Sequence, residues 1–178
     1  MLRKWRRLDE PGLEVMRLMS TADGFCATSS LVHAGSDSFA LRYIWHLDHQ
    51  WHTRRLHLSV LGADERQMDI ERMGASSWAV DGVARPDLGE CDEVDLSATP
   101  LCNTLSIKRL AGTGELTTLY VDLPRLEVSP SRQRYEIVAP NRWRFIDLGV
   151  AKGFKALIDV DAEDFVTQYE GLFEILAT

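Results

Sequence analysis

Apolar and polar side chains alternate along much of this chain with the two-residue period of β-strands. The clearest case is residues 39–47, in which every odd-numbered position is aromatic or aliphatic, whereas the even-numbered positions include Arg42 and His46. A strand with one strongly apolar face is therefore predicted there. Residues 48–50 form the expected turn, and residues 51–61 return with the same alternation until Gly62.

The same pattern predicts further strands on both sides of one interruption. Before it, strands are expected at residues 66–73 and 77–80, which end at Gly74 and at the Asp81-Gly82 turn signal. After residues 111–114, strands are expected at 119–123, 126–129, 134–139, 142–148, 154–160 and 165–169. About ten short strands at hairpin spacing predict a mainly β (α+β) protein with a highly curved antiparallel sheet or barrel.

The segment that interrupts the strand alternation is predicted to form the one clear helix, at about residues 99–110. Thr99 suits the N-cap and Pro100 suits the first helical position, where a missing N–H has no cost. Carboxylates precede the helix and Lys108 and Arg109 close it, in keeping with the helix dipole. We expect the concave face of the sheet to cover the apolar side of this helix, at Leu101, Leu105 and Leu110.

Length and charge narrow the class of protein. A chain of 178 residues with 45% hydrophobic content suits one domain, residues 1–178. The net charge of −7 disfavours a nucleic-acid partner. No run of eighteen apolar residues occurs, and none follows the basic cluster at residues 3–7, so neither an integral membrane segment nor a secretory leader is expected. Three widely spaced cysteines fit a reduced, cytoplasmic protein.

Four segments carry a family resemblance: Trp78–Gly82, Asp92–Pro100, Asn103–Leu110 and Phe165–Phe173. In particular, Asp-x-x-Asp-Leu-x-x-Thr-Pro followed by Asn-Thr-Leu-x-Ile-Lys-Arg-Leu is similar to the signature of a bacterial glycolipid-binding family. Cys102 and Ser106 depart from that signature, which has threonine and proline there. The resemblance implies a spiral β-roll wrapped around a single central helix, association as a homodimer, and a lipid or glycolipid as partner.

Several acidic residues lie just before the predicted helix, and their presence has two interpretations. Paired carboxylates such as Asp92 and Asp95 can act as general acid and base on a glycoside. We favour the structural interpretation, in which Asp92, Asp95, Thr99 and Asn103 form a cluster that satisfies polar groups at the helix start. The alternative, a small hydrolase or isomerase that uses Asp92 and Asp95, stays open.

Three histidines bracket one predicted turn. If the turn has three residues, His46 and His52 face one another across the hairpin, with His49 between them. A solvent-exposed turn explains the same pattern, and the surrounding residues offer few further ligands. We therefore expect no metal site, and no cofactor.

Aromatic side chains with a polar edge suit a groove that holds an acyl chain and a sugar. The sequence thus favours a non-enzymatic lipid- or glycolipid-binding protein; a structural dimerising β protein without a ligand is a further alternative. The candidate ligand-binding residues are Arg42, Trp45, Arg55, Trp78, Leu101, Leu105, Arg109 and Tyr120.

Overall fold

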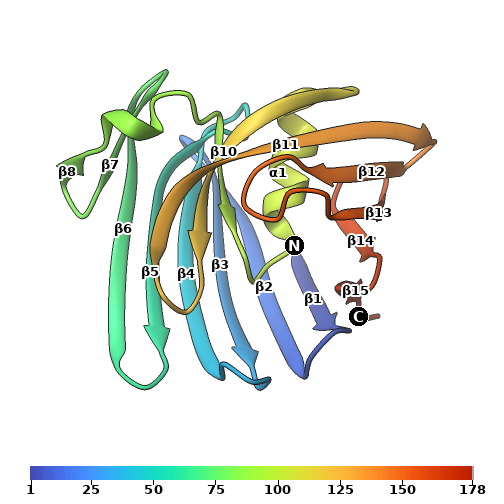
Figure 1. Ribbon diagram of the computed structural model, residues 1–178, viewed down its shortest axis with the longest axis horizontal. Helices are drawn as coiled ribbons and strands as arrows, with labels where there is room; N and C mark the ends of the chain where they lie inside the picture. Colours follow the sequence, from blue (N-terminus) through green and yellow to red (C-terminus); the bar gives the residue numbers. More distant parts are fainter. Residues whose placement is uncertain (178) are drawn as a thin grey trace.

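A single large curved sheet runs through the computed structural model, which describes residues 1–177 (Figure 1). The described residues form fifteen strands, one α-helix and one short 3-10 helix, so the protein is mainly β as predicted. The strand order is β8-β7-β6-β5-β4-β3-β2-β1-β15-β14-β13-β12-β11-β10-β9. Because β8 and β9 are the two ends of this order, the sheet is open rather than a closed barrel.

The first half of the sheet is an antiparallel meander of long strands. Its strands are β1 (Leu2–Arg7), β2 (Gly12–Thr21), β3 (Gly24–His33), β4 (Phe39–Leu47), β5 (Thr53–Leu61), β6 (Glu65–Gly74), β7 (Ser77–Val80) and β8 (Val83–Ala84). The 3-10 helix η1 (Pro86–Leu88) follows.

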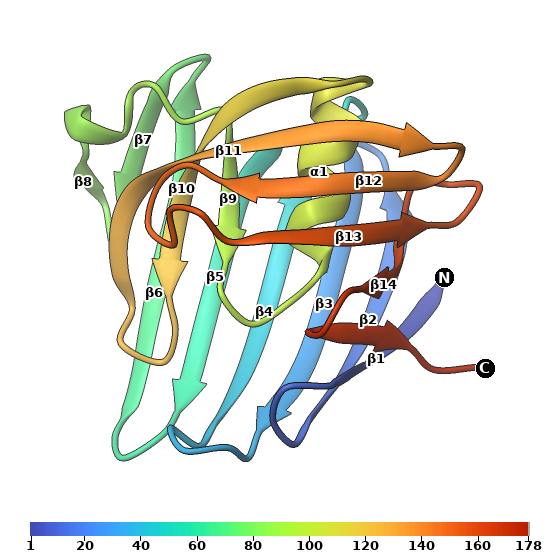
Figure 2. The ribbon, with the colours of Figure 1, turned by 45° about the vertical axis from the view of Figure 1, so that its right-hand side comes forward.

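The second half crosses over the first (Figure 2). Its strands are β9 (Glu93–Leu96), β10 (Gly114–Asp122), β11 (Glu127–Ala139), β12 (Arg142–Asp147), β13 (Lys155–Val160), β14 (Val166–Tyr169) and β15 (Phe173–Ile175). Only β9 and β10 pair in parallel. The two halves join where β1 pairs with β15, which brings the N- and C-terminal strands side by side.

The alternation in residues 39–47 is confirmed as β4, with every odd-numbered side chain buried. Two expectations about strands were wrong. The estimate of ten strands is too low, because it leaves out β1 to β3, β8, β9 and β15. Residues 126–129 and 134–139 form one strand, β11, despite Pro130. Since β12 pairs with β11 only from Gln133 onward, Pro130 lies where β11 has one neighbour, a position at which a strand tolerates proline.

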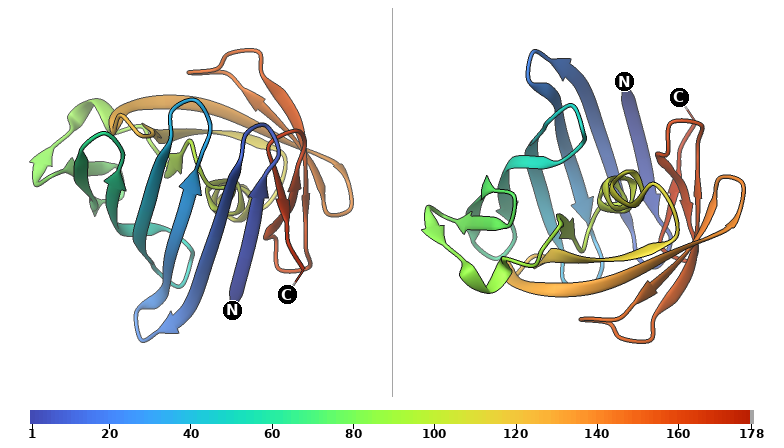
Figure 3. Two further views of the ribbon diagram at one scale, coloured as in Figure 1. Left: turned by 90° about the horizontal axis from the view of Figure 1, so that it is seen from below. Right: turned by 90° about the horizontal axis from the view of Figure 1, so that it is seen from above.

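The helix α1 (Leu101–Leu110) begins slightly later than predicted. Pro100 rather than Thr99 occupies the N-cap, although the Thr99 hydroxyl still accepts a hydrogen bond from the Leu101 N–H at 3.3 Å. Residues 101–107 are all buried. Viewed from above and below, α1 lies between the two halves of the sheet (Figure 3). It ends at Ala111, whose left-handed backbone (φ 50°) lets its N–H bond to the Ile107 carbonyl.

Two apolar clusters fill the interior. The larger one joins the inner face of β1 to β7 to α1 and includes Trp5, Trp45 and Trp78. The smaller one lies beneath β11 to β15 and includes Tyr135, Trp143 and Phe145. The helix contributes to both, with Leu101 and Leu105 in the larger cluster and Ile107 in the smaller one.

Candidate functional site

A hollow of about 170 Å³, here called the helix-start pocket, opens beside the first turn of α1. The polar residues that line it, here called the polar wall, are Asp95, Ser97, Thr99, Asn103, Tyr120 and Asp147. The apolar residues that line it, here called the aromatic wall, are Phe145, Val150, Ala151, Phe154, Tyr169, Leu172 and Phe173. The lining of the pocket therefore combines two carboxylates with several aromatic rings.

The sheet register positions the polar wall. Asp95 on β9 lies opposite Tyr120 on β10, and Asp147 at the end of β12 lies opposite Gln133 on β11. The chain leaves β9 and enters α1 after four residues, so Asn103 reaches the same hollow. Four separate segments thus meet at one point.

A chain of hydrogen bonds holds the Asp95 carboxylate in place. Gln133 Nε2 donates to Asp95 Oδ2 at 2.5 Å, and the Gln133 Oε1 accepts from the Tyr135 hydroxyl at 3.2 Å. The Tyr135 oxygen in turn accepts from Asn103 Nδ2 at 3.0 Å. Because Tyr135 donates to Oε1, the Gln133 amide has a single orientation, with its nitrogen toward Asp95.

Burial changes the protonation chemistry of this wall. Removal from water raises the pKa of Asp95 to about 6; the Gln133 hydrogen bond opposes this shift, and the Asp147 charge adds to it. Burial and the Asp95 charge raise the pKa of Tyr120 to about 12. At neutral pH the pocket therefore presents a carboxylate acceptor beside a protonated phenol donor.

Four predicted residues line the pocket together: Asp95, Thr99, Asn103 and Tyr120. Asp92, the fourth member of the predicted helix-start cluster, does not line the pocket, and its carboxylate accepts a hydrogen bond from the Thr117 N–H at 3.3 Å. Neither Asp92 nor Asp95 bonds to the first N–H groups of α1, where Thr99 takes that role.

Four other candidate residues are part of the core. Trp45, Trp78, Leu101 and Leu105 are at most 1% exposed. The Trp45 ring N–H donates to Thr53 Oγ1 at 2.7 Å, and that of Trp78 donates to the Cys91 carbonyl at 3.1 Å. Their side chains are occupied by packing, and they do not line the helix-start pocket.

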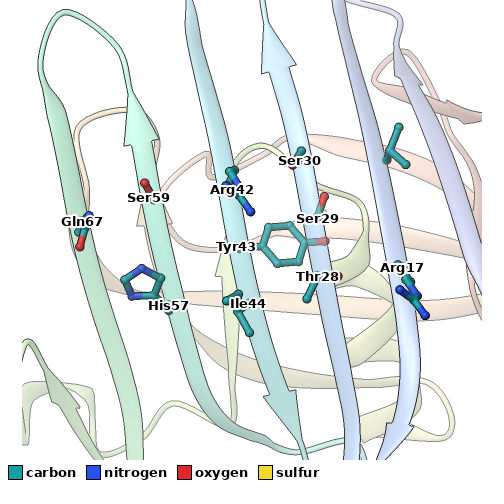
Figure 4. A pocket seen from close by; sticks show the side chains of 11 residues that line it. Arg17, Thr28, Ser29, Ser30, Arg42, Tyr43, Ile44, His57, Ser59 and Gln67 are labelled. Atoms are coloured by element: carbon teal, nitrogen blue, oxygen red, sulfur yellow. The ribbon is translucent and has the colours of Figure 1, made fainter.

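The three arginines among the candidates lie apart from one another. Arg109 contacts His52 at the end of α1, and Arg55 pairs with Asp69 and Glu71. Arg42 lines a separate groove on the face of the sheet turned away from α1 (Figure 4).

The histidine turn does not have the geometry that a three-residue loop would give. The register shifts at the end of β4, so His46 lies opposite Arg55 rather than His52. His52 instead pairs with Asp48 at 3.2 Å. Within residues 1–177, no three histidine, cysteine or acidic side chains gather in a way that could hold a metal ion.

Sequence reasoning missed Asp147 on β12, which lines the pocket, and Gln133 and Tyr135 on β11, which support Asp95 from outside the lining. Phe145 and Asp147 alternate with exposed residues on β12, which places both on one face, but a single acid at a strand end gave no sign of burial. Asp147 is 5% exposed and accepts a hydrogen bond from the Gly149 N–H at 2.7 Å. Gln133 and Tyr135 were missed because only the pairing of β11 with its neighbours brings them to the helix.

Two more carboxylates are buried in the interior, outside the lining of the pocket. Glu93 accepts a hydrogen bond from the Thr53 N–H at 3.0 Å, and Glu14 accepts 2.7 Å bonds from the Ser29 and Tyr43 hydroxyls. Burial raises the pKa of both. The second oxygen of Glu14 has no partner among the described residues.

A more open groove of about 420 Å³ lies next to the helix-start pocket. The two hollows share Tyr120, Val150 and Ala151 in their linings. The groove also contains the ion pair of Arg125 with Asp122.

Comparison with known proteins identifies the family of this chain. The fold is that of a mainly β protein with one large sheet and one buried helix. A family model described as "Putative glycolipid-binding" matches residues 3–174. The chain belongs to this family.

A solved relative has the same fold. The crystal structure of a DUF1089 family protein from Pseudomonas aeruginosa superposes with a TM-score of 0.81 and 28% sequence identity, over 92% of each chain. No curated protein matches the chain. Within residues 1–177, no helix has both the length and the apolarity needed to span a membrane.

Proposed function

We propose that this protein binds a glycolipid non-enzymatically and holds one sugar ring in the helix-start pocket. The observation that carries the proposal is the lining of that pocket, which combines Asp95 and Asp147 with a group of aromatic rings. The family description points to the same class of ligand.

Sugar chemistry matches both walls. A pyranose ring has hydroxyl groups that donate to carboxylates and accept from a phenol such as Tyr120. Its C–H faces pack against rings such as Phe145 and Tyr169. At about 170 Å³ the hollow is smaller than the roughly 300–1,000 Å³ of typical drug-sized ligand sites, so it suits one ring rather than a longer oligosaccharide.

The acyl chain then leaves the pocket toward solvent. Val150 and Phe154, two apolar residues that line the pocket, are 49% and 39% exposed. Covering such surface with an acyl chain contributes about 0.8 kcal/mol per buried methylene. We place the chain along Val150 and Phe154, and no cofactor is needed for this activity.

Finer features of the proposal come from the family resemblance and from composition. We assign the open sheet around α1 to the spiral β-roll class, with a homodimer as the assembly. The three cysteines are unpaired and buried, which suits a reducing, cytoplasmic setting.

Two measurements test the proposal. Mass spectrometry of an organic extract of the purified protein is expected to show a co-purified glycolipid. Calorimetry is expected to show binding of octyl glucoside and none of an octyl sulfobetaine, because both have the same chain and only the first has a sugar. Equal binding of the two detergents would contradict the sugar assignment.

A matched pair of variants locates the ligand. In Asp95→Asn, the amide oxygen accepts from Gln133 and the amide nitrogen faces the pocket, so an acceptor becomes a donor. Loss of a hydrogen bond to a charged group predicts octyl glucoside binding about tenfold weaker or worse. Asp23→Asn, at an exposed turn, is the control and is expected to bind as the parent protein does.

A second candidate function rests on the raised pKa of Asp95. A carboxyl group with a pKa of about 6 could donate a proton to a glycosidic oxygen. Asp92 would have no part, since it lies outside the pocket. Turnover of nitrophenyl glycosides that is lost in Asp95→Asn with intact stability would favour this enzyme over the binding protein.

A further inference from the structure

The face of β1 to β5 turned away from α1, here called the outer face, has an unusual composition. Paired positions on these strands form rows across the sheet. One row runs Arg17, Thr28, Ile44 and His57, and the next runs Val15, Ser30, Arg42 and Ser59. Figure 4 shows most of these side chains on the same side of the sheet.

The charge of this face is opposite to that of the whole chain. Alternation along β1 to β5 places Lys4, Arg6, Arg17, Arg42 and Arg55 on it, and no carboxylate from the same strands. Acidic residues begin only at β6, where Asp69 and Glu71 pair with Arg55. A chain of net charge −7 therefore carries a cationic surface on one side.

Two of these cations lack a counter-ion. Within the described part of the chain, no carboxylate lies within ion-pair distance of Arg17 or Arg42, whereas Arg6 pairs with Glu174. Both guanidinium groups are exposed and lie on either side of β3, which separates their strands. They are available to an anion from outside.

The side chains around these arginines create a groove of about 590 Å³. Thr28 and Ser30 on β3 are short, and the longer side chains of Arg17 and Arg42 rise on the flanking strands. Adjacent strands lie about 4.8 Å apart and the two arginines belong to neighbouring rows, two residues apart along the strands, so their backbones stand roughly 12 Å from one another across β3. That span accommodates a phosphate group that contacts both guanidinium groups and the hydroxyls between them.

Apolar side chains surround the groove on the same face. Leu13, Val15, Val32, Ile44 and Leu61 are each 42–60% exposed and occupy neighbouring positions in the cross-strand rows. A surface that combines free cations with clustered apolar groups matches the interface of an anionic bilayer, which offers negative head groups above an apolar layer.

We propose that the outer face docks on an anionic phospholipid membrane and that the groove takes one lipid phosphate between Arg17 and Arg42. A second copy of the chain is a poorer occupant, because two such faces would bring their unpaired cations together. The inference does not use the helix-start pocket, which lies on the other side of the sheet.

Vesicle flotation tests this inference. The protein is expected to float with vesicles of phosphatidylcholine and phosphatidylglycerol in about equal amounts, and to stay behind with phosphatidylcholine alone. The double variant Arg17→Ser/Arg42→Ser is expected to bind the anionic vesicles about 30-fold more weakly. The matched control Arg132→Ser/Arg144→Ser removes the same charge from exposed positions on β11 and β12 and is expected to leave binding nearly unchanged.

A second pair of variants tests the apolar part without removing an arginine. Val32→Glu places a negative charge on the outer face and is expected to abolish flotation, whereas Ile137→Glu on β11 is expected to have little effect. Equal binding to neutral and anionic vesicles, unchanged binding of the double arginine variant, or a dimer that Val32→Glu dissociates would overturn the proposal. Octyl glucoside calorimetry on the same variants reports separately on the pocket.

Discussion

Asp95 combines a fixed position in the pocket with a pKa that its surroundings raise. Its carboxylate faces the helix-start pocket and is held from behind by Gln133, so its position is fixed before any ligand arrives. Burial raises its pKa to about 6, close enough to neutrality that moderate changes of pH alter its charge. Two consequences can be measured, one for stability and one for binding.

The first prediction concerns stability. A carboxyl group whose pKa is about 6 in the folded state and 3.8 in the unfolded state binds its proton more tightly when folded. Its contribution is therefore fully present below about pH 4 and is lost as pH rises through 6. Asp95→Asn is expected to exceed the parent protein in stability at pH 8 by at most about 3 kcal/mol, and to match it at pH 4. Urea denaturation at both pH values measures this, and a constant difference would contradict it.

The second prediction concerns the pH dependence of binding. A sugar hydroxyl donates to the ionised form of Asp95, so affinity for octyl glucoside is expected to rise between pH 5 and pH 7 and then to level off. Asp95→Asn is expected to lose this dependence as well as affinity. Calorimetry across the range provides the test, and a flat profile in the parent protein would show that Asp95 does not bind the ligand.

At the scale of elements, the sequence predicted best those strands and helices that are determined by a short, contiguous stretch of residues. The strand over residues 39–47 was predicted to the residue because its alternation is uninterrupted. The helix was predicted to within two residues, since Thr99, Pro100 and the following apolar positions are contiguous. By contrast, the continuity of β11 through Pro130 depends on where β12 stops, which no local pattern encodes.

The helix offers the third prediction. Leu105 on α1 is 1% exposed and belongs to the larger apolar cluster, so Leu105→Ala is expected to cost about 2–5 kcal/mol of the free energy of unfolding. Leu110→Ala, at the half-buried end of the same helix, is the control and should cost clearly less. Urea denaturation of both variants distinguishes them, and equal losses would mean that the helix does not organise the core.

At the scale of the whole molecule, the site depends on the joining of distant parts of the chain. Asp95, Thr99 and Asn103 are close in sequence and were predicted together. Phe145, Asp147 and Tyr169 reach them only because the second half of the sheet folds back over α1. The sequence therefore grouped the residues near the helix start, as a structural cluster rather than a ligand site, and did not bring Asp147 and Tyr169 to them.

The strand that joins the halves gives the fourth prediction. β15 pairs with both β1 and β14, and its Phe173 is 6% exposed at the border of the pocket. Deletion of residues 173–178 is expected to cost more than about 3 kcal/mol and to abolish octyl glucoside binding. Deletion of residues 177 and 178 alone keeps β15 and should retain binding. Similar behaviour of the two deletions would show that β15 does not hold the halves together.

The measurement that tests the central claim most directly is the contact between a bound sugar and the pocket in solution. Nuclear Overhauser spectra of the protein with octyl glucoside should show transfer from the pyranose protons to the rings of Phe145 and Tyr169 and to the methyl groups of Val150 and Ala151. Transfer confined to the outer-face residues Val15 and Ile44, or no transfer to the helix-start pocket while binding persists, would contradict the account.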